Sequence, residues 1–132
     1  MMRLVKSPGG SIYPYHYKDG EIHCLKYGSF FQNHAALFDL YRAEEDFIRS
    51  TNRRLRIWVD FYETNISEEV LTKFLESINS INDYILKISI VGLSFFDIWR
   101  LNRLSKKVGV KSNCPIRYYK DPEDAKTWLV SE

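Results

Sequence analysis

Hydrophobic and polar residues alternate in several short segments of this chain, and apolar residues recur every three to four positions between those segments. Alternation is typical of strands, and the three-to-four spacing is typical of amphipathic helices. The pattern therefore predicts a hairpin followed by a repeated succession of helix and strand. The predicted elements are a hairpin over 11–28, strands over 55–61, 85–93 and 115–119, and helices over 33–49, 67–81 and 94–109, with a last helix from 121.

Local signals mark where these elements begin and end. Asp19-Gly20 is a strong turn signal for the hairpin, because both positions tolerate positive φ. Ser67 is placed to cap one helix, and Ser94 with Asp97 resembles a capping box at the start of the next. Five apolar residues are expected to form the buried side of that helix: Phe95, Ile98, Trp99, Leu101 and Leu104.

The predicted strand centres follow one another at intervals of about thirty residues, the length of a right-handed βαβ crossover. The expected fold class is α/β, with a mostly parallel sheet of four to five strands led by an antiparallel hairpin strand. In 55–61, apolar residues alternate with Arg56, Trp58 and Asp60, and Lys87 interrupts the next strand similarly. Since a sheet covered on both faces would be apolar throughout, we expect helices mainly on one face and an open, partly polar second face.

Composition narrows the class of protein. At 132 residues the chain fits one domain over 1–132, with 1–10 expected to form a loose terminus. Cys24 and Cys114 are too far apart in sequence to suggest a disulfide framework or zinc site, and no long apolar run or signal peptide is evident. We therefore expect a cytoplasmic protein with no membrane span, no metal and no cofactor.

The segments K-x-S-I-V-G-L-S (87–94) and D-P-E-D-A-x-x-W-L (121–129), in a βαβαβα order, resemble the SpoIIAA-like or STAS superfamily, specifically bacterial STAS/SEC14-like proteins. The resemblance covers roughly residues 20–130 and implies a sheet with helices largely on one side. It also implies a serine phosphosite at the turn before the second helix, residues 64–69, where Ser67 is the one serine and the remaining candidate. The Ser-Gly-Leu pattern of that turn is missing, and Glu68 and Glu69 would repel a phosphate, so simple capping by Ser67 is favoured.

Other chemistry finds little support in the sequence. The turn at Gly92 has one glycine, whereas a nucleotide cradle needs several. Asp60 and Glu63 could form a carboxylate pair for acid and base catalysis, although a structural role is favoured. Residues 87–120 contain eight Lys or Arg and one acid, and a basic patch is expected at Arg100, Arg103 and Lys107. No nucleic-acid-binding module accompanies this patch, so nucleic acid is not expected as a partner.

These observations favour a non-enzymatic regulatory or protein-interaction domain of the STAS type, binding a protein partner or a second copy of itself as a homodimer. The predicted partner-binding residues are Arg56, Trp58, Asp60, Lys87, Ser67 and Ser94. Two alternatives stay open. One is a carrier of a small apolar or lipid-like ligand, which the SEC14-like relationship implies, and the other is an enzyme using Asp60 and Glu63.

Overall fold

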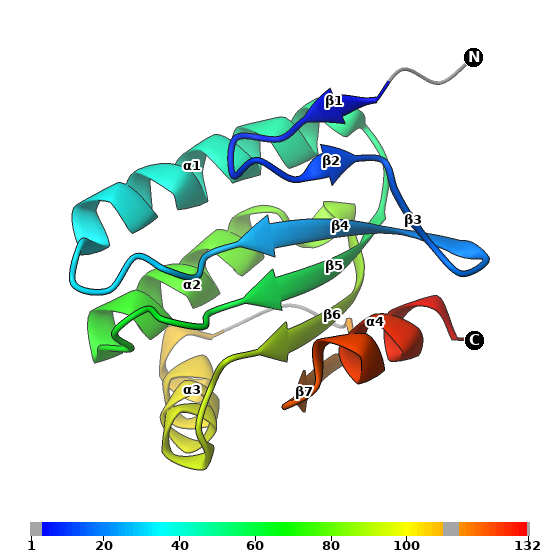
Figure 1. Ribbon diagram of the computed structural model, residues 1–132. Helices are drawn as coiled ribbons and strands as arrows, with labels where there is room; N and C mark the ends of the chain where they lie inside the picture. Colours follow the sequence, from blue (N-terminus) through cyan, green and yellow to red (C-terminus); the bar gives the residue numbers. More distant parts are fainter. Residues whose placement is uncertain (1–3, 110–113, 132) are drawn as a thin grey trace.

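The computed structural model describes residues 4–109 and 114–131. Its main sheet has the strand order β3-β4-β5-β6-β7, in which β3 is antiparallel to β4 and the other strands are parallel (Figure 1). Strands β1 and β2 form a small antiparallel sheet beside α1. The predicted α/β class, with an antiparallel strand leading a parallel sheet, is confirmed.

The bounds of the elements agree closely with the hydrophobic pattern. The strands are β1 (Val5–Lys6), β2 (Ile12–Tyr13), β3 (Tyr15–Tyr17), β4 (Gly20–Lys26), β5 (Leu55–Asp60), β6 (Ile85–Val91) and β7 (Ile116–Tyr119). The helices are α1 (His34–Thr51), α2 (Glu68–Ser80), α3 (Phe95–Val108) and α4 (Pro122–Val130), with a 3-10 turn over Asn82–Tyr84.

The larger core lies between the sheet and helices α1, α2 and α3, which share one face (Figure 1). Ile57 and Val59 of β5 and Ile88 and Ile90 of β6 point into this core, and all four are at most 1% exposed. The alternation along β5 places Trp58 on the opposite face. The strand pattern thus identified the core face correctly.

The second face is not open, because α4 lies across it (Figure 1). Ala125 and Leu129 of α4 are fully buried against Ile22, Cys24 and Trp58. The prediction that the second face of the sheet is open is therefore wrong for the middle of that face. Three helices cover one side and a single short helix covers the other, so helices do lie mainly on one face.

Residues 1–10 were predicted to form a loose terminus, but the segment from Val5 to Gly10 is held in place. Val5 and Lys6 pair with β2, and the hydroxyl of Ser7 donates to Glu44 of α1 at 2.9 Å. Glu44 in turn contacts His23 of β4, with Nε2 and Oε1 3.0 Å apart and both side chains fully buried. Residues 1–3 lie outside the described residues.

Candidate functional site

Parallel strands end together at one edge of a sheet, and ligands of α/β proteins usually bind beyond that edge. Here the loops leaving β4, β5 and β6 pack directly on one another. A Cβ atom added to Gly28 would lie 2.5 Å from the carbonyl oxygen of Tyr62, and one added to Gly92 would lie 2.5 Å from its amide nitrogen. The space that a phosphate would need beside Gly92 is thus filled by backbone, so this turn supports the fold.

Ser67 and Ser94 both serve as helix caps, as predicted. The Ser67 hydroxyl accepts a hydrogen bond from Val70 N–H at 3.1 Å. Ser94 accepts from Asp97 N–H, and the Asp97 carboxylate accepts from Ser94 N–H, which completes the capping box. Each hydroxyl oxygen already accepts a hydrogen bond from an amide of its helix start, so capping accounts for both serines.

Asp60 and Glu63 lie at the same edge but bind different groups. Asp60 accepts a hydrogen bond from Tyr62 N–H at 2.8 Å, whereas Glu63 accepts one from the Ser29 hydroxyl at 2.9 Å. Partial burial is the main cause that raises the pKa of Asp60, and Glu63 adds to the rise. The hydrogen bond from Tyr62 N–H opposes it most, followed by Lys26 and Lys126. Both carboxylates therefore have structural partners.

Replacing Asp60 with asparagine is expected to raise the free energy of unfolding by about 0.5 kcal/mol at pH 7. Burial raises the pKa of Asp60 above that of an unfolded aspartate, so the ionised form opposes folding at neutral pH. Asparagine keeps the acceptor for Tyr62 N–H without the charge. The gain should fade as the pH falls through the folded pKa and vanish below the unfolded value, because the wild-type carboxyl group is then neutral in both states.

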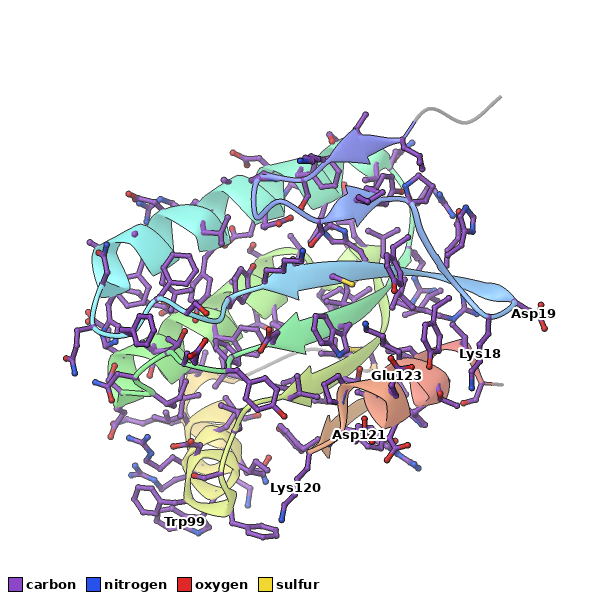
Figure 2. All side chains as sticks on the ribbon, viewed as in Figure 1. Lys18, Asp19, Trp99, Lys120, Asp121 and Glu123 are labelled. Atoms are coloured by element: carbon purple, nitrogen blue, oxygen red, sulfur yellow. The ribbon has the colours of Figure 1, made fainter. Side chains whose placement is uncertain are left out.

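Urea unfolding at pH 7 and pH 3.5 measures this difference. Asp19→Asn, at the exposed tip of the β3–β4 hairpin (Figure 2), controls for the substitution itself. If Asp60→Asn is less stable than wild type at neutral pH, the ionised carboxylate of Asp60 instead stabilises the carboxyl end of the sheet.

Arg56, Trp58 and Lys87 do share the α4 face, as predicted, but α4 occupies much of it. Trp58 is only 8% exposed, so a partner cannot reach its ring without moving α4. The ammonium of Lys87 donates to the carbonyls of Trp128 and Ser131 at 3.1 and 2.9 Å, and burial is the main cause that lowers its pKa. Lys87 therefore holds the C-terminal end of α4.

The predicted basic patch on α3 is likewise divided. Arg100 is largely buried and donates to the carbonyl of Ile66 at 2.6 Å and to Asp97 at 2.9 Å. Arg103 approaches Glu68 at 3.4 Å, and Lys107 is exposed. The three residues do not present one continuous row of free charges.

The most distinctive surface feature is a group of exposed aromatic residues, which we call the aromatic rim: Tyr62, Phe95, Phe96 and Trp99. Their exposed fractions are 42%, 82%, 62% and 58% in that order. The expectation that Phe95 and Trp99 form part of the buried side of α3 is wrong. Figure 2 shows Trp99 at the protruding end of α3, and its exposed fraction means that the described elements leave more than half of it uncovered.

Cations and a hollow accompany the aromatic rim. Arg100 lies 5.0 Å from the Phe96 ring, Arg103 lies 5.4 Å from the Trp99 ring, and Lys120 lies 5.6 Å from the Phe95 ring. Such pairs hold both the cations and the rings in place. Between α3 and the end of β7 is a hollow of about 410 Å³, lined by Leu93, Ser94, Phe95, Ile98, Tyr118, Tyr119 and Lys120.

The hydroxyl of Tyr62 fixes one side of this surface by donating to the Lys120 carbonyl at 2.6 Å. The loop after β5 is thereby joined to the end of β7. Burial raises the pKa of Tyr118, which lines the hollow, to about 12, so its hydroxyl stays neutral at physiological pH. The result is a formed surface with a mainly aromatic and aliphatic lining and basic residues at its border.

The exposure of Phe95 and Trp99 could have been predicted from helical periodicity. Leu101 and Leu104 are 3% exposed and define the buried stripe of α3. At about 100° per residue, Trp99 lies about 140–160° around the helix from both leucines, and Phe95 lies about 120–180° from them. Both aromatic residues therefore belong to the outward side.

Comparisons with known proteins add no relative: no family model, no curated protein and no solved structure matches this chain. Among the described residues, no helix is both long and apolar enough to cross a membrane. The same part of the chain brings together no group of three or more His, Cys, Asp or Glu that could hold a metal ion.

Proposed function

We propose that this chain is a non-enzymatic, cytoplasmic interaction domain of the STAS type, which binds a protein partner through the aromatic rim. The observation that carries the proposal is the joint exposure of Phe95, Phe96 and Trp99 beside a formed hollow. Clustered exposed aromatic residues are unusual on a protein without a partner, and Trp, Tyr and Arg dominate the binding energy of protein interfaces.

The order of the site also supports binding. The Phe96 and Trp99 rings stack at a centroid distance of 5.9 Å, and neighbouring arginines lie over them. Because these side chains are already held in place, a partner would lose little conformational entropy in ordering them. The acids proposed for catalysis, Asp60 and Glu63, are by contrast engaged with the backbone and with Ser29.

Trp99→Ala is expected to weaken binding of the partner at least about tenfold, which corresponds to about 1.4 kcal/mol. Proteins captured by the wild type would be identified by mass spectrometry, and the purified partner would then be titrated by calorimetry. Native mass spectrometry of the chain alone shows whether the partner is a second copy, and the dimerisation constant is then the quantity measured.

Leu4→Ser provides the matched control. Leu4 is 61% exposed, similar to Trp99, and precedes β1, which lies far from α3 (Figure 1). Its replacement should change the dissociation constant less than about twofold, as surface changes outside an interface usually do. Equal binding by Trp99→Ala and wild type would refute the proposal, and a co-purified lipid occupying the rim would favour the carrier hypothesis instead.

A further inference from the structure

We propose that the partner contributes one extended, acidic peptide segment, which adds as a strand to the edge of β7 and places an apolar side chain in the adjacent hollow. This inference rests on the proposed function and names the chemistry of its partner. The juxtaposition of an edge strand, an apolar hollow and two cations carries it.

Strand β7 offers an edge for pairing. It is the last strand of the main sheet, and among the described residues it pairs only with β6. Ile88 N–H donates to the Pro115 carbonyl at 3.0 Å, which fixes the phase of the parallel ladder. Because such a ladder uses alternate residues, the backbone groups of Ile116 and Tyr118 face away from β6 and can bind an added strand.

The hollow adjoins this edge. Tyr118 and Tyr119 of β7 form one side, and Leu93, Phe95 and Ile98 form the other. Its volume of about 410 Å³ lies within the range of about 300–1,000 Å³ that is common for ligand pockets. Alternate side chains of an added strand point to the same side, so a strand on β7 can direct an apolar side chain into the hollow.

Charge selects an acidic strand. Arg117 lies within β7 and Lys120 directly follows its last residue, and both are exposed. Arg117 lies 5.2 Å from the Trp128 ring and Lys120 lies 5.6 Å from the Phe95 ring, and neither has an acidic partner among residues 4–109 and 114–131. Cations on an edge strand discourage indiscriminate pairing, and they favour an incoming strand of opposite charge.

Two other occupants fit this arrangement less well. A membrane surface would use the aromatic residues and cations, but it would leave the backbone groups of Ile116 and Tyr118 without a role. A second copy of the chain pairing β7 with β7 would bring Arg117 and Lys120 of both copies together, and like charges oppose each other. An acidic peptide satisfies the edge, the hollow and the charges together.

The test uses the full chain and a display library of random ten-residue peptides. Selected peptides should be acidic and should contain an aromatic or aliphatic anchor. For the tightest synthetic peptide, Lys120→Glu should raise the dissociation constant at least tenfold. Lys18→Glu makes the same charge change at the β3–β4 hairpin, away from Lys120 (Figure 2), and should leave the dissociation constant within twofold.

Hydrogen exchange then distinguishes strand addition from other binding modes. Bound peptide should slow exchange at the amides of Ile116 and Tyr118, while Arg117 and Tyr119, which face β6, should change little. Neutral or basic selected peptides, no selected peptide at all, or protection without this alternation would overturn the inference. Binding to vesicles of phosphatidylserine and phosphatidylcholine that depends on Trp99 would also overturn it, in favour of a membrane surface.

Failure here is distinguishable from failure of the proposed function. If a captured protein partner depends on Trp99 but tolerates Lys120→Glu and leaves the β7 amides unprotected, the rim binds proteins by another mode. If neither the partner nor any peptide depends on Trp99, both proposals fail.

Discussion

Replacing Glu44 with alanine is expected to lower the free energy of unfolding by about 3 kcal/mol or more. The Glu44 carboxylate is fully buried and accepts hydrogen bonds from the Ser7 hydroxyl at 2.9 Å and from Gly9 N–H at 3.0 Å. Its other oxygen lies 3.0 Å from Nε2 of His23, which is buried as well. Alanine would remove the acceptor of the Ser7 hydroxyl and of Gly9 N–H, and it would leave the buried Nε2 of His23 without its partner. Breaking a buried polar pair by removing one member is costly because the other member stays buried and unpaired.

Chemical unfolding in urea, followed by circular dichroism, measures this loss. Asp46→Ala is the matched control, because Asp46 is on the same helix, its side chain is 83% exposed and it pairs at the surface with Arg49. That control should change stability by less than about 0.5 kcal/mol. Ser7→Ala removes the donor to Glu44 and the acceptor of Ser11 N–H, and it should cost about 1 to 2 kcal/mol, less than Glu44→Ala.

Glu44→Ala should destabilise the amino-terminal segment more than the rest of the protein. Ser7 and Gly9 reach α1 through the single carboxylate of Glu44, while Ser11 donates to the Cys24 carbonyl of β4. In Glu44→Ala, amide exchange should therefore accelerate first at β1 and β2. A variant as stable as wild type would mean that water replaces the carboxylate, and the buried network would then be dispensable.

Replacing Gly92 with alanine is expected to cost about 3 kcal/mol, through two separate effects. Gly92 has φ of 93°, a conformation that residues with a Cβ atom rarely adopt. Its Cβ would also lie 2.5 Å from the amide nitrogen of Tyr62 and 2.8 Å from the carbonyl carbon of Phe61, both of which are backbone atoms. The loops after β5 and β6 would have to separate.

Gly109→Ala isolates the first effect. Gly109 ends α3 with φ of 74°, and an added Cβ would meet nothing within 4 Å. Its replacement should cost about 1 kcal/mol, so the difference between the two variants measures the close packing at the carboxyl edge. Thermal unfolding of both variants gives this comparison. If both variants lose the same stability, the loops after β5 and β6 accommodate the extra methyl group at little cost.

Gly92→Ala should also disturb the aromatic rim. Gly92 leads into α3, and Tyr62 joins the loop after β5 to Lys120. A displacement of Tyr62 therefore changes the wall of the hollow without altering any rim residue. In a folded Gly92→Ala variant, partner binding should weaken, whereas Gly109→Ala should bind as wild type does.

The elements and their order could be predicted because each follows from local physical chemistry. The Ser94–Asp97 capping box, the Ser67 cap and the turn between β3 and β4 depend on residues only a few positions apart. In that turn the positive φ falls at Lys18, whereas the sequence pattern indicates Asp19 and Gly20. The core face of β5 follows from a repeat of two. These signals are complete within short windows of sequence, so the α/β class followed from them.

The candidate site was harder to predict. The apolar residues of α3 were assigned to one buried side, yet Leu101 and Leu104 are buried while Phe95 and Trp99 are exposed. Residue type alone does not tell whether an aromatic side chain of a helix is buried or exposed. That depends on its angular position around the helix and on whether a neighbouring element packs against it. The start of α3 projects beyond the sheet, so the described elements leave its aromatic residues largely exposed.

The sequence by itself determined the positions of the strands and helices and the core-facing side of the central strands, because caps, turns and periodicity act over a few residues. Only the tertiary structure decided three further features. It placed α4 over Trp58, buried Glu44 against His23 and Ser7, and brought the end of β7 beside the start of α3. Each joins segments distant along the chain, and such contacts depend on how whole elements pack, which no short window of sequence contains.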